Sequence, residues 1–390
     1  MTAPAPSDVV QLADKVEFLG RPQSYGGCSG VRRIETHMSW LFILNDLVYK
    51  LKKPVRFPYL DFSTLAKREA ACRAEAALNR ALAPGVYLGV TPLTEGPRGI
   101  DIGGEGRTIE WLVIMRRLDV TRGLDRRLVE DPPSPGELNG LTAELAHFYR
   151  HARRVRLDPM RHLAAWRSAL LADRAVLLDP ALKLPAAMVR RIDRVLQRML
   201  RIQAATLLAR TRAGRIVDGH GDLRPEHIFL DGLYVRIIDR LEFNTALRAV
   251  DPLDEVVFLD LECERLGAAD VGRIIRQRVQ RQLGERPQDS LIHFYRCHRA
   301  MLRARLSIAH LLEPNPRTPE KWPRQALAYL RIAARDALRL EVLLNRRRDP
   351  RGLGLAGAGR SSLRKAERRV GFRLSCAQRV PGAGRAGRRP

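Results

Sequence analysis

The character of the sequence changes near residue 119, and this change constrains the fold more than any single motif does. Residues 31–118 hold short runs of β-branched, aromatic and aliphatic residues, which is the pattern of strands. Residues 119–345 hold long segments with apolar residues at three- and four-residue spacing, which is the pattern of helices with one buried face. The sequence therefore predicts an α+β chain in which a small strand-rich part precedes a larger helical part.

The strand-rich part is predicted to contain three strands, one helix and two more strands. The first runs are VRRIET, WLFIL and LVYKLKK, and the pair Asn45-Asp46 makes a tight turn between the last two. A helix follows over TLAKREAACRAEAALNR, with Asp61 or Ser63 as its N-cap and Ala83-Pro84-Gly85 as its stop. The runs YLGVTPL and RTIEWLVIMRRL are two more strands, and a glycine-rich turn joins them.

The helical part is interrupted at residues 215–243, RIVDGHGDLRPEHIFLDGLYVRIIDRLEF. Two brief apolar runs on either side of an Asp-Gly turn predict a β-hairpin there. Asp222 comes shortly before this hairpin and Asp239 directly after it. We therefore expect the hairpin to fold both carboxylates towards one cleft.

The formal charge of +26 is concentrated at the C-terminus. Residues 346–390 contain 14 Lys and Arg against 2 Asp and Glu in a Gly/Arg/Pro-rich context, and we expect disorder there. A strongly basic chain can bind nucleic acid, but no recognised nucleic-acid motif or interleaving of aromatic and basic residues accompanies the charge. We interpret the tail as a solubilising extension and keep nucleic-acid binding as an alternative.

The five cysteines are scattered, without a C-x-x-C pair or a Cys/His spacing typical of zinc. This distribution predicts a reducing compartment and no disulfide framework. The N-terminus lacks the basic and apolar regions of a signal peptide, and no run approaches 18 apolar residues. We expect a cytoplasmic protein without a membrane span.

The interrupted segment carries the chemistry of phosphoryl transfer, which needs one carboxylate near the acceptor hydroxyl and another on magnesium. Its pattern, H-G-D-L-x-P-x-x-I-x-L followed by I-I-D-x-x-E, resembles the H-G-D-x-x-x-x-N and [IV]-I-D motifs of aminoglycoside phosphotransferases, choline kinases and fructosamine kinases. Residues 30–310 are similar to a bacterial aminoglycoside-phosphotransferase-like branch, some members of which are fused to a P-loop ATPase domain. No G-x-x-x-x-G-K-[ST] motif occurs in this sequence, so that domain is not expected here.

The resemblance implies a bilobal protein-kinase-like fold. Residues 31–118 would form the nucleotide-binding N-lobe, and residues 119–345 would form the C-lobe with the catalytic loop and metal site. Residues 1–30 would be an N-terminal extension, and residues 346–390 the basic tail.

In the N-lobe, the resemblance assigns a phosphate-binding lysine to Lys50, with Lys52 on the same strand face as the alternative. Its glutamate partner would be Glu75, which matches the family better than Glu69. A solvent-facing role is the competing interpretation for each of these side chains.

Two further parts of the N-lobe would meet the nucleotide. Met115 and Arg116 end the last strand, so their backbone would lie against the adenine. The family's G-x-G-x-x-G loop is absent, and the turn Thr36-His37-Met38-Ser39, including Ser39, would cover the phosphates instead.

In the C-lobe, Asp222 would accept the proton of the acceptor hydroxyl, while His220 would brace the catalytic loop. Asp239 would bind magnesium. His227 stands where the family usually has Asn, and magnesium prefers oxygen ligands over nitrogen. Three explanations stay open: His227 is a metal ligand, or one metal suffices and His227 has another role, or phosphotransfer is impaired.

A set of acidic residues follows the hairpin, and we interpret it as a solvated face that could also approach substrate. Its members are Glu242, Asp251, Asp254 and Glu255.

The leading functional hypothesis is a small-molecule phosphotransferase that uses ATP or GTP with Mg²⁺ and an unidentified acceptor. The alternatives are a nucleotide-binding pseudokinase with little turnover and a nucleic-acid binder acting through the basic tail. The resemblance cannot fix the acceptor, because one fold serves many substrates.

Overall fold

The computed structural model describes residues 10–346 except 28, 233, 314–315 and 317, and it contains two compact units. The first unit takes the described residues up to 162 together with 208–286, and the second takes 163–207 together with those from 287 onwards. The predicted disordered tail lies outside the described residues apart from Arg346, which ends the last helix.

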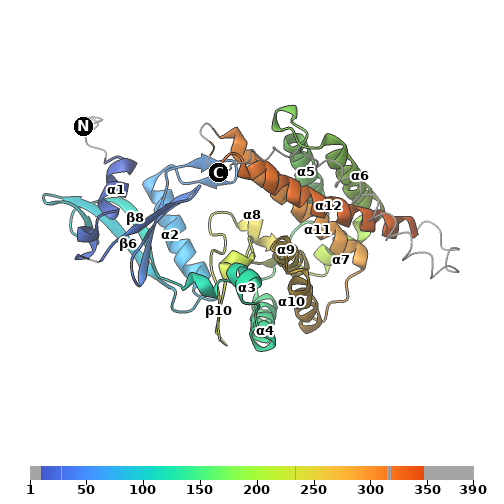
Figure 1. The fold of residues 1–390 in the computed structure, drawn as a ribbon, viewed down its shortest axis with the longest axis horizontal. Helices are drawn as coiled ribbons and strands as arrows, with labels where there is room; N and C mark the ends of the chain where they lie inside the picture. The colour runs from blue at the N-terminus through green and yellow to red at the C-terminus, as the bar shows by residue number, and fades with distance from the viewer. Residues whose placement is uncertain (1–9, 28, 233, 314–315, 317, 347–390) are drawn as a thin grey trace, which may run out of the picture. The chain divides into compact units, whose positions relative to one another are not determined.

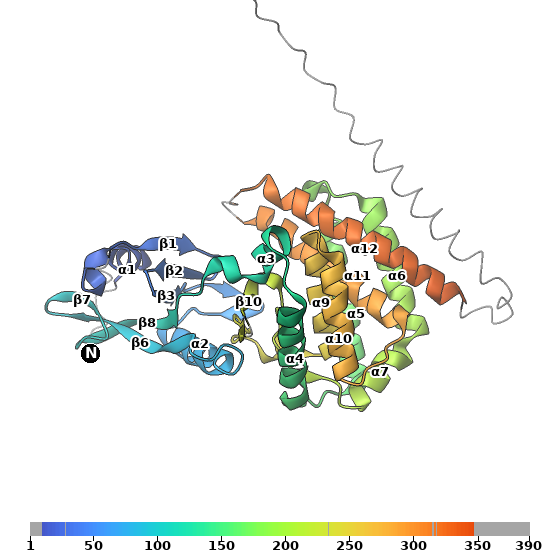
Figure 2. The same ribbon diagram turned by 60° about the horizontal axis from the view of Figure 1, so that its bottom comes forward.

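The first unit begins with a six-stranded antiparallel sheet of order β1-β2-β3-β8-β6-β7 (Figures 1 and 2). Its strands are β1 (Arg32–Glu35), β2 (Ser39–Ile43), β3 (Leu47–Lys52), β6 (Tyr87–Gly96), β7 (Gly99–Ile102) and β8 (Arg107–Arg116). The predicted meander of three strands is confirmed, because β1 pairs with β2 and β2 pairs with β3. The last predicted strand, β8, lies between β3 and β6.

Two predictions about this region were wrong in detail. The glycine-rich turn contains β7, which pairs with β6 and turns at Gly99 with a φ of 97°. The helix α2 (Leu65–Asn79) is capped by Thr64, whose side chain accepts a hydrogen bond from the Lys67 amide. Asp61 instead belongs to β5 (Leu60–Asp61), which pairs with β4 (Arg56–Phe57) in a small hairpin.

Helices cover both faces of the sheet because side chains alternate along its strands. On one face, α1 (Leu12–Leu19), which lies within the N-terminal extension, packs Leu19 against Phe42 and Leu51. On the other face lies α2 (Figure 1), and its Cys72 packs with Val113 of β8. This alternation places Lys50 and Lys52 on the α2 face.

The rest of the first unit is mainly helical and surrounds the predicted hairpin. The hairpin forms, with β10 paired to β11 across the Asp-Gly turn. Apolar residues of the surrounding helices, such as Leu145 and Leu259, pack with Ile228 and Ile237 of the hairpin. The elements are α3 (Leu124–Glu130), α4 (Pro135–His151), β9 (Val217–Asp218), β10 (Ile228–Asp231), β11 (Tyr234–Ile237), α8 (Thr245–Arg248), β12 (Ala249–Val250), α9 (Pro252–Arg265) and α10 (Ala269–Gln282).

The second unit is helical. It contains most of α5 (Pro159–Leu177), all of α6 (Ala186–Ile202), the start of α7 (Ala204–Arg212), α11 (Asp289–Ala309) and α12 (Lys321–Arg346). Helix α12 packs along α11 and also against α6. The interior of the second unit holds buried side chains such as Phe294, Tyr329 and Leu340.

The predicted α+β class is therefore confirmed, with a small antiparallel-sheet lobe followed by a larger helical part. None of the described helices combines the length and apolar character that crossing a bilayer requires.

Candidate active site

Strand β3 presents two lysines to one buried glutamate of α2. Lys50 Nζ lies 2.7 Å from Glu75 Oε1, and Lys52 Nζ lies 2.6 Å from Glu75 Oε2. Leu51, between the two lysines, is fully buried in the core on the opposite face of the sheet. The two residues that the sequence offered as alternatives therefore share the same partner.

The other candidate glutamate of α2 lies outside this cluster. Glu69 is paired with Arg73 at 2.9 Å, one helical turn away, and the Arg73 side chain is largely exposed. Glu75, by contrast, is completely buried. The helix thus brings Glu75, and not Glu69, to the lysines.

The segment after the hairpin brings Asp239 to the same cluster. Asp239 Oδ1 lies 3.2 Å from Lys50 Nζ, and Asp239 has a positive φ of 63°. This backbone conformation is uncommon for a residue with a side chain and occurs often at functional sites. The Asp239 amide donates to the Tyr87 hydroxyl at 3.2 Å.

The opposite charges in this cluster shift the pKa values of Lys50 and Asp239. Burial alone would lower the pKa of Lys50, but the carboxylates of Asp239 and Glu75 outweigh it and raise that pKa well above its ordinary value. The Lys50 ammonium in turn holds the pKa of Asp239 well below its usual range, against the effect of burial. Both groups are therefore charged at neutral pH.

An amide bridge fixes the segment after Asp239 to α2. The backbone N–H of Arg240 donates to Asn79 Oδ1 at 2.8 Å, and Asn79 Nδ2 donates to the Arg240 carbonyl at 3.4 Å. The Arg240 side chain then donates to the carbonyls of Gly219 and Asp218, just before the H-G-D loop of residues 220–222. Helix α2, Asp239 and the loop are thus connected through one arginine.

The H-G-D loop holds Asp222 between a histidine and an arginine. His220 Nε2 donates to the Ile238 carbonyl at 2.9 Å, and its Nδ1 accepts from the Asp222 amide at 3.3 Å. His220 is almost completely buried, and burial lowers its pKa to about 3. Arg224 Nε donates to Asp222 Oδ2 at 2.9 Å.

The imidazole of His227 lies between the two aspartates. Its Nδ1 is 4.0 Å from Asp222 Oδ2, and its Nε2 is 3.5 Å from Asp239 Oδ2. The loop and the strand end therefore place both carboxylates within reach of one side chain, which is the convergence that the sequence predicted.

These groups border a cavity of about 370 Å³ in the first unit. Lys50, Lys52, Ser39, Met115, Arg224, His227 and Asp239 all line it. Arg116 does not, and its amide donates to the Val86 carbonyl. Asp222 lies one hydrogen bond from the lining, through Arg224.

The turn predicted to cover phosphates uses two of its own amides internally. The Thr36 N–H donates to the Ser39 carbonyl at 2.8 Å, and the Ser39 N–H donates to Thr36 Oγ1 at 3.0 Å. The turn lines the cavity at Thr36, His37, Met38 and Ser39. The Thr36 hydroxyl also donates to the Ser39 carbonyl at 2.9 Å, so a phosphate contact from these two residues would come from the Ser39 hydroxyl.

The interpretation of the later acidic residues as a solvated face was wrong. Glu242, Asp251, Asp254 and Glu255 are all buried. Glu242 Oε1 accepts from Lys52 at 2.5 Å, and Asp251 pairs with Arg210. The three- and four-residue spacing of charges in the sequence did not predict this burial. The cations that pair with these carboxylates come from elements distant in the chain.

Glu255 is the residue near the candidate site whose position the sequence predicted least well. Its carboxylate accepts hydrogen bonds from the His220 amide at 3.0 Å, the Gly221 amide at 2.5 Å and the Tyr149 hydroxyl at 2.8 Å. A Cβ on Gly219 would come within 2.7 Å of this carboxylate. The H-G-D loop is therefore fixed by a buried carboxylate of α9.

Comparison with known proteins gives relatives without an assigned activity. No protein-family model matches the chain. Uncharacterized proteins of Mycobacterium bovis and Mycobacterium tuberculosis are 31% identical over 284 residues, which is 72% of this chain and 55% of theirs. The chain thus spans about half the length of the curated relatives it matches.

The solved structures that the chain resembles include aminoglycoside phosphotransferases and choline or ethanolamine kinases. A choline/ethanolamine kinase family protein from Mesorhizobium loti has a TM-score of 0.48 and 17% identity, over 86% of this chain and 98% of that one. Choline kinase from Cryptosporidium parvum has a TM-score of 0.48 and 11% identity, over 80% and 90%. ADP-bound aminoglycoside phosphotransferase APH(2'')-Ib has a TM-score of 0.44 and 13% identity, over 82% and 98%.

Proposed function

We propose that the chain is a phosphotransferase that moves the terminal phosphate of ATP or GTP to a hydroxyl of a small molecule. The observation that carries this proposal is the position of Lys50, which pairs with Glu75 and Asp239 at the wall of one cavity. A lysine held by a helix glutamate beside a metal-binding aspartate is the arrangement that phosphoryl transfer requires.

The nucleotide would lie in the cavity with its phosphates on Lys50. The Glu75 carboxylate orients the ammonium, and Lys52 holds Glu75 from the other side. Met115 lines the cavity at the end of β8, where the base would lie. The Ser39 hydroxyl would contact the phosphates from the turn above.

The donor set fits a magnesium ion. Asp239 offers carboxylate oxygen at the cavity wall, and Mg²⁺ in proteins commonly uses one or two carboxylates together with substrate phosphates. A bound ion would neutralise charge on the terminal phosphates. Asp239 would hold it, with His227 as the neighbouring nitrogen.

Asp222 would receive the proton of the acceptor hydroxyl. Its backbone is held by His220, and the loop is held by Glu255. This support keeps the carboxylate at one position relative to Asp239, because the His220 ring donates to Ile238, next to Asp239. His220 thus positions the loop and transfers no proton itself.

The test is nucleotide consumption by the full chain with Mg²⁺ and a panel of hydroxyl-bearing acceptors. The panel includes choline, ethanolamine and aminoglycosides, because the similar solved structures include kinases named for these compounds. Asp222→Asn is expected to lower turnover by about 10²–10⁴-fold while leaving nucleotide affinity within a few-fold. Glu69→Gln, on the exposed side of α2, serves as the control.

Equal consumption by wild type and Asp222→Asn would refute the role of Asp222. Absence of nucleotide binding to the wild type would refute the proposal as a whole.

A nucleotide-binding protein with little turnover is the second candidate, and one observation favours it. The Asp222 carboxylate is engaged by Arg224 at 2.9 Å, so the base is already hydrogen-bonded. Nucleotide binding without turnover across the panel, unchanged in Asp222→Asn, would favour this candidate over the first.

A further inference from the structure

Helix α6 of the second unit has two chemically distinct faces. Its buried face carries Val189, Ile192, Leu196 and Met199. Its other face carries Arg190, Arg194, Gln197 and Arg201, at intervals of three and four residues. This spacing keeps the four side chains on one stripe, about 16 Å long at 1.5 Å per residue.

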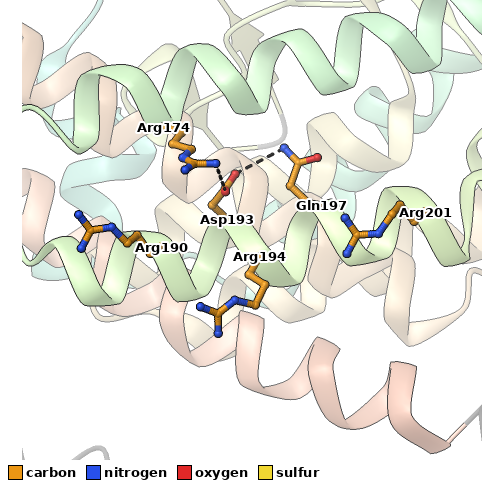
Figure 3. Close-up of a pocket in the computed structure, with 6 residues that line it drawn as sticks. All are labelled: Arg174, Arg190, Asp193, Arg194, Gln197 and Arg201. Atoms are coloured by element: carbon orange, nitrogen blue, oxygen red, sulfur yellow. Dashed lines mark hydrogen bonds and ion pairs between the residues drawn. The ribbon is translucent and has the colours of Figure 1, made fainter.

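The stripe forms one wall of a groove of about 300 Å³ (Figure 3). Arg174 of α5 enters from the other wall and donates to Asp193 at 3.4 Å. The buried Asp193 also accepts from Gln197 at 3.5 Å. Asp193 therefore orients Arg174 and Gln197 towards the groove.

The groove carries uncompensated positive charge. Among the described residues, Arg190, Arg194 and Arg201 have no ion pair, whereas Arg191 on the same helix pairs with Glu341 at 3.1 Å. The groove lining thus holds four arginines and one carboxylate, that of Asp193. Arginines one helical turn apart repel each other, and an anion placed between them would remove that repulsion.

We propose that this groove binds a linear oligophosphate. Guanidinium groups match phosphate oxygens with paired hydrogen bonds, and a row of them one turn apart matches a row of phosphate groups. The volume is that of a small-ligand site. The same chemistry is present in inorganic tripolyphosphate and in the phosphate chain of a nucleoside triphosphate.

The test measures binding of inorganic tripolyphosphate to the full chain by isothermal titration calorimetry at low and moderate salt. The double variant Arg190→Gln/Arg194→Gln is expected to bind at least about tenfold more weakly. Arg191→Gln is the matched control, because it removes a neighbouring arginine that is outside the groove, and it should bind within twofold of wild type. Circular dichroism confirms that each variant is folded.

Equal affinity in all three proteins would overturn the proposal, since the anion would then bind elsewhere, such as the basic tail that every variant retains. A nucleoside triphosphate arm uses the Lys50→Met background, which removes the main phosphate contact of the first cavity. Binding of the nucleotide that depends on Arg190 and Arg194 supports the groove and identifies a nucleotide as its ligand. Binding of a single-stranded oligonucleotide with no affinity for tripolyphosphate would also overturn the proposal.

A second inference concerns His227 and rests on the proposed function. His227 Nδ1 lies 2.9 Å from the Asp222 carbonyl oxygen, which can only accept a hydrogen bond. Nδ1 therefore carries the proton, and Nε2 holds a lone pair directed towards the side of Asp239.

The Nε2 lone pair of His227 already has a hydrogen-bond donor beside it. Arg224 NH2 lies 3.3 Å from His227 Nε2, while the same guanidinium donates to Asp222 Oδ2 and Glu226 Oε1. A metal ion on Nε2 would have to displace a guanidinium that is held by two carboxylates. We infer that Arg224 takes the place of a second divalent ion, so the nucleotide complex holds one ion, on Asp239.

The test counts Mn²⁺ ions per chain by electron paramagnetic resonance, with a non-hydrolysable ATP analogue at saturation. Wild type and Arg224→Lys, which keeps the cation, are expected to bind one ion. Arg224→Met, which frees Nε2, is expected to bind two.

Two ions in the wild type would overturn the inference, as would one ion in Arg224→Met. Absence of both nucleotide and Mn²⁺ binding would instead refute the proposed function, so the two failures are distinguishable.

Discussion

Two clusters in the described part of the sheet lobe each join one buried glutamate to two cations, and the Glu75 cluster borders the cavity described above. In the first, Glu110 of β8 is paired with Arg68 of α2 at 2.8 Å and Lys15 of α1 at 3.2 Å. In the second, Glu75 of α2 is paired with Lys50 and Lys52 of β3. The glutamates are 1% and 0% exposed, so burial does not distinguish them.

The difference lies in what else each cluster contacts. The Glu110 cluster joins the helices on the two faces of the sheet and is absent from the lining of the described cavity. The Glu75 cluster has additional carboxylates, Glu242 and Asp239, that come from beyond the hairpin. An ion network buried on all sides stabilises the fold, whereas one that opens on a cavity has a charge available for a ligand.

The largest expected effect is on stability, from Glu110→Gln. This change leaves Arg68 and Lys15 buried without their carboxylate, and breaking a buried ion pair in this way costs about 3–5 kcal/mol. Urea unfolding should show the loss, while nucleotide affinity of the folded fraction stays unchanged. A loss of affinity without a loss of stability would erase the distinction between the two clusters.

The next largest effects should distinguish the two lysines of β3, one by stability and the other by nucleotide affinity. Lys52→Met leaves Glu242 without its cation, so we expect a loss of about 2–3 kcal/mol in unfolding free energy. Lys50→Met removes the phosphate contact, and we expect nucleotide affinity to fall by at least about tenfold, a loss of roughly 1.4 kcal/mol. Calorimetric titration with nucleotide and urea unfolding of both variants would measure the contrast, which identical profiles would contradict.

A buried group without an ion pair gives a smaller, pH-dependent effect. The pKa of His220 is about 3 in the folded chain because of burial, so only the unfolded chain takes up this proton near the ordinary pKa of about 6.5. Folding therefore loses stability as pH falls below about 6.5, by up to about 1.4 kcal/mol per pH unit and so by about 2 kcal/mol at pH 5. His220→Asn should flatten this part of the pH profile of urea unfolding.

The exposed His147→Asn on α4 is the control for His220→Asn, because it also removes one histidine. If both variants changed the slope between pH 6.5 and 5 equally, burial of His220 would not be the cause.

The smallest effect is expected at the surface of α2. Glu69→Gln breaks an i,i+4 pair with Arg73, and exposed pairs of this kind contribute about 0.3–0.5 kcal/mol. A loss above about 1 kcal/mol in unfolding free energy would mean that Glu69 matters to stability despite its place on the exposed side of α2, and would contradict the contrast with the buried Glu75.

Local sequence patterns predicted the elements whose residues interact with near neighbours. The meander, the hairpin and the shared face of Lys50 and Lys52 all follow from alternation and turn residues over short distances. The N-cap of α2 was displaced by one residue from Ser63 to Thr64, because Asp61, Ser63 and Thr64 are all suitable caps.

Patterns failed where the partner is distant in the chain. Glu255 lies 35 residues from His220, and Glu242 lies 190 residues from Lys52. A run of acidic residues in a sequence is interpreted as a solvated face unless the cations that neutralise it are known. Those cations are brought close only by the tertiary structure. The residue types therefore predicted which side chains of the candidate site lie together, while the fold determines which of the other carboxylates are buried.

The two hydrogen bonds between Asn79 and Arg240 join helix α2 to the segment that carries Asp239. A rotation of α2 about its axis would pull Asp239 out of register with Lys50, because the bridge constrains both the N–H and the carbonyl of Arg240. A shift of α2 would therefore change the distance between Asp239 and Lys50 at the wall of the cavity.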